Sequence, residues 1–281
     1  MELVSAIIVT YYPQPDILKR NINMLLEQVP HVIIVDNTDK RLKWLDCFGG
    51  YKSVEIINNE VNQGIATALN QGCRKALQMG YKWAVTLDQD SILPVGFVND
   101  LWTGLPQGLK KIGAIGPVYT SFGNYIGERG KVVKIDSVIT SGCLMNLTAF
   151  EMTGGFLDEL FIDMVDIEYC WRLKQNNYSV LMNGNAVLDH QLGNRMISKK
   201  VFGKVYQYAD HSPLRTYYFT RNVLWVTKRY KTLMPFEYAD YRYGLKKEIF
   251  KIIFVSDKKV KKIFYVFWGY LHYLTNRLGE L

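Results

Sequence analysis

The sequence predicts an α/β protein with a mostly parallel central sheet flanked by helices, followed by a basic helical extension. Through residues 4–117, apolar β-branched stretches alternate with stretches of helical spacing, as in repeated strand–helix–strand units. Polar residues follow several expected strands, where such sheets bind their ligands. Residues 1–194 carry a net charge of −4 (16 Lys/Arg, 20 Asp/Glu), and residues 195–281 carry +12 (18 and 6). These two ranges are therefore predicted to be separate domains.

The first half of the chain contains the clearest alternation. Strands are expected at residues 4–10, 31–35, 54–58, 83–87 and 112–117, and helices at 16–28, 65–79 and 97–105. The first helix has a proline near its start, and Gly80 follows the second helix as a stop residue. This order of elements predicts the parallel part of the sheet.

The second half is less regular. Residues 119–136 are irregular and contain several glycines, strands are expected at 137–146 and 180–188, and helices at 148–153 and 165–175. The last of these helices begins with acids and ends with Arg172 and Lys174, an order that complements the helix dipole. From about residue 194 onward the pattern becomes helical, basic and aromatic.

Composition excludes several classes of protein. The cysteines are widely spaced and form no CxxC pair, which argues against a zinc site or a disulfide framework and suits a reducing cytoplasm. The first residues lack the basic region and cleavage site of a signal peptide. No stretch reaches the roughly 20 apolar residues that a membrane span needs, because the longest late run covers only residues 263–274.

Two carboxylates follow the expected strand at 83–87, in the tripeptide Asp88-Gln89-Asp90. Burying two carboxylates close together is costly unless they share a cation. Mg²⁺ or Mn²⁺ binds through one or two carboxylates and leaves positions for phosphate oxygens. The tripeptide therefore indicates a metal–diphosphate site at the end of a strand. The other interpretation is a strand-end turn with solvated aspartates, in which Ser91 makes a local cap.

Polar motifs at five other places accompany this tripeptide. They are Thr10-Tyr11-Tyr12-Pro13, Asp36-Asn37, Asn62-Gln63-Gly64 with Asn70, the segment from Asp163 to Arg172, and His190. Each has a structural interpretation when taken alone: a turn, a capped helix, an acid favouring a helix dipole, or a structural histidine. The stretch at Gly64 is not a P-loop, although a helix N-terminus offers free N–H groups to an anion.

The order of these motifs resembles the family-2 glycosyltransferases, which have an A-type, Rossmann-like nucleotide-sugar fold. The similarity is greatest to the bacterial rhamnosyltransferases of surface-polysaccharide assembly and covers roughly residues 4–230. It implies a metal-dependent, inverting transfer of a sugar to a hydroxyl group of an acceptor. The implied donor is dTDP-L-rhamnose, and the implied acceptor is a glycan, either free or lipid-linked.

The resemblance also implies which residues bind the donor. The expected nucleotide-sugar contacts are Thr10, Tyr11, Asp36, Asn62, Gly64, Asn70, Asp88 and Gln89. Asp36 would accept a hydrogen bond from a base N–H or a ribose hydroxyl. Asp90 is the expected direct ligand of Mg²⁺ or Mn²⁺, with Asp88 and His190 as further metal ligands.

For the catalytic base, the family places a carboxylate six residues before the helix arginine, which is Asp166 when counted from Arg172. Asp163 and Glu168 are close rivals for this role. The chain has Val165-Asp166 where the family often has Glu-Asp, which affects the expected acceptor contact more than the base. Residues expected on the acceptor side are Ser141, Gly142, Asp163 and Glu168.

The C-terminal part combines basic pairs with Trp and Tyr. Such a pattern suits an interfacial helix on anionic lipid, so a cytoplasmic protein on the inner face of the membrane is expected. The alternative is an aromatic helical core with its lysines in solvent. No nucleic-acid recognition motif is present.

Two other functions remain open from the sequence, and a third is disfavoured. The enzyme could use another UDP- or dTDP-sugar, and a binding module without turnover would carry a similar donor site. A sugar-nucleotide pyrophosphorylase would need a glycine-rich, Arg-containing loop, but residues 10–18 contain no glycine.

Overall fold

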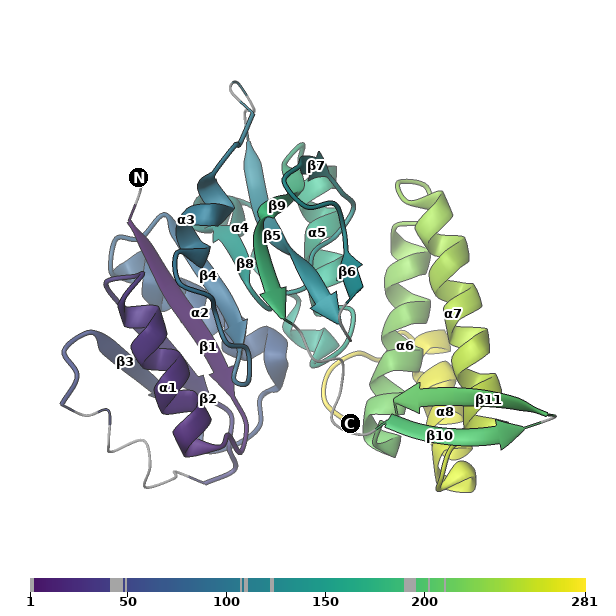
Figure 1. Cartoon of the computed structure of the whole chain (residues 1–281). Coiled ribbons are helices and arrows are strands. Elements are labelled where there is room, and N and C mark those ends of the chain that lie inside the picture. Colours follow the sequence, from purple (N-terminus) through teal and green to yellow (C-terminus); the bar gives the residue numbers. More distant parts are fainter. Residues whose placement is uncertain are drawn as a thin grey trace. The chain divides into compact units, whose positions relative to one another are not determined.

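The computed structural model describes residues 3–40, 48, 50–106, 108, 111–121, 124–189, 196–201, 203–209 and 211–281. The chain divides into two compact units (Figure 1). One contains Met1–Leu157 and Asp166–His190, and the other contains Asp158–Val165 and Gln191–Leu281. The residues around the predicted boundary at 194/195 lie outside the described part of the chain, so that boundary stays a prediction.

The first unit is built on one mixed sheet, which has nine strands in the described residues. Its order is β3 (Val54–Asn58), β2 (Val32–Asp36), β1 (Val4–Thr10), β4 (Trp83–Asp88), β8 (Cys143–Asn146), β5 (Ile112–Ser121), β9 (Ser179–Asp189) and β7 (Val132–Lys134), with β6 (Asn124–Ile126) paired to β5. The pairings make β1, β2, β3, β4, β5 and β9 run in one direction, and β6, β7 and β8 run against them. The prediction of a mostly parallel sheet flanked by helices is confirmed.

Helices cover both faces of this sheet. The apolar core that includes Ala6, Ile8 and Ile34 also contains residues of α1 (Pro15–Leu26) and α3 (Phe97–Trp102). Helix α2 (Gly64–Gln78) packs on the opposite face, where a Cβ at Gly72 would come within 2.5 Å of the Ile7 side chain. Burial on both faces explains why every residue of β1 is buried and why β1, β2 and β4 are mostly apolar.

The parallel register brings polar residues together at one edge of the sheet. Thr10 at the end of β1 is paired with Asp36 at the end of β2, and Val9 is paired with Asp88 at the end of β4. Parallel strands end at the same edge, so residues that are 26 and 79 positions apart along the chain become neighbours. Ligands of open α/β sheets bind at this edge.

Two expected strands have different bounds in the structure. Strand β5 continues to Ser121 instead of ending at 117, because the irregularity at Pro117, which has no N–H, is absorbed by a register shift against β9. The strand expected at 137–146 is confined to Cys143–Asn146, since Gly142 adopts a left-handed φ of 73° that extended backbone does not use. Helices α4 (Leu147–Thr153) and α5 (Val165–Gln175) follow the predicted positions.

The second unit begins with an element that the sequence interpretation missed. Residues from 196 onward were expected to be helical, but β10 (Met196–Val201) and β11 (Lys204–Ala209) form an antiparallel hairpin. The Tyr-Gln-Tyr alternation in the second strand, with a glycine at the turn, explains this correction.

Three helices complete this unit: α6 (Pro213–Arg229), α7 (Pro235–Phe254) and α8 (Lys259–Leu274). Ser212 caps α6 by accepting a hydrogen bond from the Arg215 N–H. Gly269 lets α8 approach α6 closely, because a Cβ there would lie 2.7 Å from the Tyr217 carbonyl oxygen. None of the helices in the described part of the chain has the length and apolarity to cross a bilayer.

Candidate active site

The buried carboxylate of Asp36 lies at the centre of the polar edge. Its Oδ1 accepts hydrogen bonds from the hydroxyls of Thr10, at 2.7 Å, and Thr38, at 2.8 Å. Its Oδ2 has no hydrogen-bond partner among the described residues, although the side chain is completely buried. An unsatisfied buried acceptor is costly, and an N–H or O–H group of a ligand would satisfy it.

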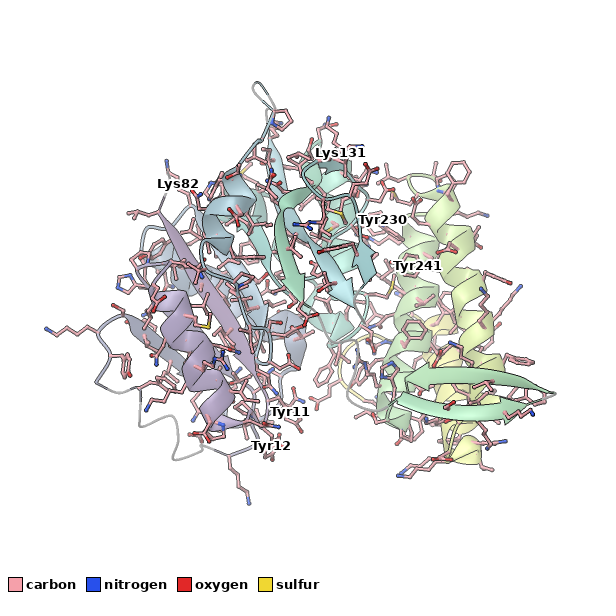
Figure 2. All side chains as sticks on the ribbon, in the orientation of Figure 1. Tyr11, Tyr12, Lys82, Lys131, Tyr230 and Tyr241 are labelled. Atoms are coloured by element: carbon pink, nitrogen blue, oxygen red, sulfur yellow. The ribbon has the colours of Figure 1, made fainter. Side chains whose placement is uncertain are left out.

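Asp39 is a second acid at this edge, and the sequence interpretation did not single it out. Its carboxylate accepts hydrogen bonds from the Tyr12 hydroxyl at 3.2 Å, the Tyr11 hydroxyl at 3.5 Å and the Asn62 N–H at 3.2 Å. Burial and then the Asp39 charge raise the pKa of Tyr11. The rings of the two tyrosines, which are labelled in Figure 2, meet edge to face with their centroids 4.8 Å apart. The polar run after Asp36 was the only hint of this cluster in the sequence.

The start of α2 belongs to the same network. Asn37 Nδ2 donates to the Gly64 carbonyl at 2.9 Å, and the Gly64 N–H donates to Asn62 Oδ1 at 3.0 Å. Gly64 needs its glycine, because its φ is 82°. Asn70 is different: it is buried and exchanges two hydrogen bonds with the backbone of Phe156. Since its amide supports the fold, we do not include Asn70 in the proposed donor site.

The Asp88-Gln89-Asp90 turn is attached to the end of β1. Gln89 Oε1 accepts a hydrogen bond from the Tyr11 N–H at 2.8 Å, and the Gln89 carbonyl accepts one from Asn21 at 3.2 Å. Asp88 is half-buried, whereas Asp90 is exposed. The turn therefore presents two carboxylates next to the polar edge that contains Thr10 and Asp36.

Ser141 and Gly142 lie beside this turn. The hydroxyls of Ser91 and Ser141 share a hydrogen bond of 2.6 Å, and the Gly142 N–H donates to the Thr86 carbonyl at 2.8 Å. A Cβ at Gly142 would lie 2.7 Å from the Leu188 side chain, in addition to the positive φ. Glycine is thus required for the close approach of this segment to the sheet.

Tyr119 connects the surroundings of two candidate carboxylates, and its role was not predicted. Its buried hydroxyl donates to the Ser141 carbonyl at 3.0 Å. Burial raises the pKa of Tyr119 well above its usual value, and the neighbouring Cys143, Asp166 and Asp88 add to this effect. The tyrosine was missed because the strand was expected to end at residue 117.

Asp166 lies in the first turn of α5 and is half-buried. Its Oδ1 accepts a hydrogen bond from the Ile167 N–H at 2.9 Å. The side chain lines a water-sized cavity of about 10 Å³ together with Thr140, Cys143 and Cys170. Burial raises the pKa of the Cys170 thiol to about 12, and the Asp166 charge contributes. The cavity therefore gives the carboxylate a largely apolar surrounding.

Glu168 has a different environment from Asp166. It is completely buried and accepts two hydrogen bonds from Arg172, Nε to Oε1 at 3.0 Å and Nη2 to Oε2 at 2.7 Å. Arg172 Nη1 also donates to the Thr153 carbonyl. This ion pair holds α5 to the end of α4, so Glu168 is not included in the proposed acceptor site. Asp163 belongs to the other compact unit, where it pairs with Arg215.

The two aspartates of the turn suit a hard divalent ion. Two carboxylates with the Gln89 amide between them supply oxygen ligands, and phosphate oxygens and water complete the coordination of Mg²⁺ or Mn²⁺ in such sites. No group of three or more His, Cys, Asp or Glu side chains that could hold a metal ion occurs in the described ranges. His190, the expected further ligand, lies outside them.

Known proteins with similar structures show the fold. GalNAc-T7 with UDP, GalNAc and Mn²⁺ aligns with a TM-score of 0.60 and 12% identity, over 79% of this chain and 48% of the GalNAc-T7 chain. This chain thus spans about half the length of that protein. Residues 1–349 of S. aureus TarS align with a TM-score of 0.58 and 12% identity, over 98% of this chain and 82% of the other.

Sequence comparison shows the family. The model of glycosyl transferase family 2 matches residues 5–140, which contain β1, β2, β4 and the polar edge. The chain is also 30% identical over 247 residues to the dTDP-rhamnosyl transferase RfbF of Shigella flexneri, covering 80% of each sequence. This chain belongs to glycosyl transferase family 2 and is a glycosyltransferase.

Proposed function

We propose that this enzyme transfers L-rhamnose from dTDP-L-rhamnose to a hydroxyl group of a glycan acceptor, with inversion at the anomeric carbon. The observation that carries the proposal is the set of polar side chains at the ends of β1, β2 and β4. The likeness to a dTDP-rhamnosyl transferase over four-fifths of the chain supports the choice of donor.

The nucleotide is proposed to bind along the ends of β1 and β2. The unsatisfied Oδ2 of Asp36 would accept a hydrogen bond from the thymine N–H or a ribose hydroxyl. Tyr11 and Asp39 would border this pocket, since their side chains already interact there. The remaining proposed donor contacts are Thr10, Asn62, Gly64, Asp88 and Gln89.

The diphosphate is proposed to lie over the Asp88-Gln89-Asp90 turn. Asp90 is exposed and is proposed to bind the Mg²⁺ or Mn²⁺ ion directly, whereas the half-buried Asp88 is proposed to bind ribose or a metal-bound water. His190 is retained as a further proposed ligand. The ion would supply Lewis-acid stabilisation of the charge that develops on the leaving dTDP.

Asp166 is proposed to be the catalytic base. Its carboxylate would take the proton of the acceptor hydroxyl as the oxygen attacks the anomeric carbon opposite the diphosphate. The C1–O bond to the diphosphate breaks, and dTDP leaves with the bonding electrons. Attack from the face opposite the leaving group would pass through an oxocarbenium-like transition state and invert the anomeric carbon. Ser141 and Gly142 are proposed to border the acceptor, and Asp163 stays a proposed acceptor-side residue.

A donor screen tests the proposal. We expect dTDP-L-rhamnose to be consumed in the presence of Mg²⁺ or Mn²⁺ faster than UDP-glucose, UDP-GalNAc or dTDP-glucose, with dTDP as the released product. Thermal shift should show stabilisation by dTDP. Preference for a UDP-sugar would replace the donor, whereas nucleotide binding without turnover of any sugar would favour the non-catalytic binding module.

We also propose that α8 lies on an anionic membrane surface, at the inner face of the cytoplasmic membrane. One side of this helix exposes apolar residues at helical spacing, and they define the α8 face: Val260, Ile263, Phe264, Phe267, Tyr270, Leu271 and Leu274. Lys258 and Lys261 are exposed at its first turn. Exposed aromatic and aliphatic groups beside lysines suit the lipid interface.

A groove next to the α8 face supports this partner. It has a volume of about 390 Å³ and an apolar lining from α6, α7 and α8, including Leu245, Ile249 and Phe267. Arg242 and Lys246 also line it. An anionic lipid offers both a hydrocarbon chain for the lining and a negative headgroup for the two cations.

Vesicle co-sedimentation tests membrane binding. The enzyme should sediment with phosphatidylglycerol vesicles at low salt, and the fraction bound should fall on adding salt. Replacing Phe264 and Phe267 with serine should abolish sedimentation, whereas Val95→Ser, which changes an exposed valine of the other unit, should not. The proposal of membrane binding would be refuted if the double variant sediments with vesicles as much as the wild-type enzyme does. It would also be refuted if the enzyme associates with itself instead of with vesicles.

A further inference from the structure

The chain segment directly before Asp166 has an unusual backbone. Phe161, Asp163 and Met164 all adopt a left-handed conformation with φ of 64°. Residues with a Cβ rarely use this region, and such strain persists only where the surroundings enforce it. Three strained residues within four positions, ending two residues before the proposed base, therefore require a specific support.

Helix α6 supplies this support through Asn222. The buried Asn222 Nδ2 lies 2.8 Å from the Leu160 carbonyl oxygen, 2.8 Å from that of Ile162 and 3.0 Å from that of Asp163. Its two N–H groups are thus shared among three carbonyls of the strained segment. One side chain thus fixes the peptide planes on both sides of Asp163 and the plane that precedes Phe161.

Arg221 holds the preceding residues in the same way. Its Nη2 donates to the Glu159 carbonyl at 2.9 Å and the Leu160 carbonyl at 3.3 Å, and its Nε donates to Asn222 Oδ1 at 2.9 Å. The completely buried guanidinium also lies against the rings of Tyr217 and Tyr218. Its hydrogen bonds within the described residues all end on neutral oxygens.

Two further contacts bind the segment to α6. Arg215 pairs with the Asp163 carboxylate, with Nη2 and Oδ1 3.0 Å apart. The Phe161 ring stacks on the Tyr218 ring at 4.8 Å and an interplanar angle of 13°. Segment and helix thus form one compact unit, and the chain leaves that unit at the bond between Val165 and Asp166.

We propose that Arg221 and Asn222 are positioning residues for the proposed catalytic base. Burying an arginine without a carboxylate partner is an expensive way to stabilise a helical unit, and apolar side chains would do it at lower cost. What this pair specifies is the path of the backbone into α5. The last carbonyl that it holds precedes Asp166 by three residues, so a displacement there reaches the carboxylate. This proposal rests on the role of Asp166 given above.

Steady-state kinetics of Asn222→Ala and Arg221→Lys test the proposal. We expect kcat to fall at least tenfold in each variant, while the KM for the donor and the thermal shift with dTDP stay within twofold of wild type. The acid limb of the pH–kcat profile should also move, because Asp166 would sit in altered surroundings. Amide hydrogen exchange of residues 161–167 should become faster, which can be measured without substrate.

Two matched controls remove the same residue types from the same unit. Asn276→Ala deletes an asparagine that accepts a hydrogen bond from Trp225 of α6, and Arg229→Ala deletes an exposed arginine of α6. Both should leave kcat and exchange of the segment unchanged. Arg221→Lys keeps the positive charge, so it still tests the proposal if the Asn222→Ala variant does not fold.

The outcomes separate this proposal from the proposed function. The positioning role would be overturned if the wild-type enzyme transfers sugar and a folded Asn222→Ala or Arg221→Lys variant has the same kcat. Equal losses of kcat and of dTDP binding would also overturn it, because they indicate a general loss of structure. If the wild-type protein binds dTDP but transfers no sugar, the proposed function fails. In that case, unchanged amide hydrogen exchange of residues 161–167 in the variants would also show that Arg221 and Asn222 do not support this segment.

Discussion

Replacing Asp166 with asparagine is expected to lower kcat by roughly 10²–10⁴-fold, the usual contribution of a general base. The substitution keeps the shape of the side chain and can still accept the hydrogen bond from the Ile167 N–H. It removes the ability to take a proton from the acceptor hydroxyl. The donor should bind as before, because Asp36 and the Asp88-Gln89-Asp90 turn are unchanged.

This prediction is checked by initial rates of dTDP release with and without acceptor, together with thermal shift on dTDP. Glu151→Gln is a matched control, since it changes an exposed carboxylate of the same unit on α4 to an amide. It should retain full activity. Retained turnover in Asp166→Asn would move the base to Asp163, whose Arg215 pair would then need to open.

The pH dependence of kcat should report the ionisation of the same carboxylate, that of Asp166. A base must be deprotonated to act, so kcat is expected to fall at low pH and reach a plateau as the base ionises. The acid limb should disappear from the residual activity of Asp166→Asn. An unchanged acid limb in that variant would show that another group controls the profile.

The second large effect is expected from Asp90→Asn. A Lewis acid supplies several kcal/mol of transition-state stabilisation, so loss of the metal should lower kcat on the order of 10³-fold. The variant should also lose the additional stabilisation that Mg²⁺ or Mn²⁺ gives to the dTDP complex. At a ligand concentration of 100 Kd, binding stabilises a protein by about 2.7 kcal/mol, which thermal shift detects readily.

Wild type and variant are compared with dTDP alone, with dTDP and metal, and with dTDP, metal and EDTA. EDTA should make wild type resemble Asp90→Asn. Asp88→Asn is expected to weaken nucleotide binding even without metal, because Asp88 is proposed to contact ribose. Full activity of wild type in EDTA would contradict metal dependence, and an unchanged metal effect in Asp90→Asn would move the direct ligand elsewhere.

The local hydrophobic pattern of the sequence was sufficient to predict the parallel half of the sheet. The strands at 4–10, 31–35 and 83–87 are mostly apolar because both of their faces are covered, which leaves a nearly continuous hydrophobic signature. Polar residues just after such runs must lie at one edge of a parallel sheet. The placement of Thr10, Asp36 and Asp88 as neighbours therefore followed from the sequence by itself.

The same hydrophobic pattern gave the wrong strand bounds where a strand departs from regular pairing. The extension of β5 through Pro117 depends on a register shift against β9, and the short β8 depends on the left-handed Gly142. Neither effect is a property of the local sequence. Tyr119 was missed for this reason, since its position on a strand beside Ser141 exists only once β5 continues.

The roles of individual polar residues were decided by the side chains and backbone groups that contact them in the folded protein. Asp166 and Glu168 are both acids in the first turn of α5, yet Glu168 is enclosed by Arg172 and only Asp166 lines the cavity. Asn62 and Asn70 flank the start of the same helix, but Asn70 is bonded to Phe156.

By itself, the sequence determined the α/β class, the parallel strands and the edge at which polar residues collect, because these follow from hydrophobic periodicity and chain direction. Only the tertiary structure decided which acid is buried in an ion pair, that Asp39 joins the tyrosines, and that Asn222 supports the strained segment before Asp166. The last two are contacts across tens of residues, and all three depend on distance and direction in space rather than on local residue type.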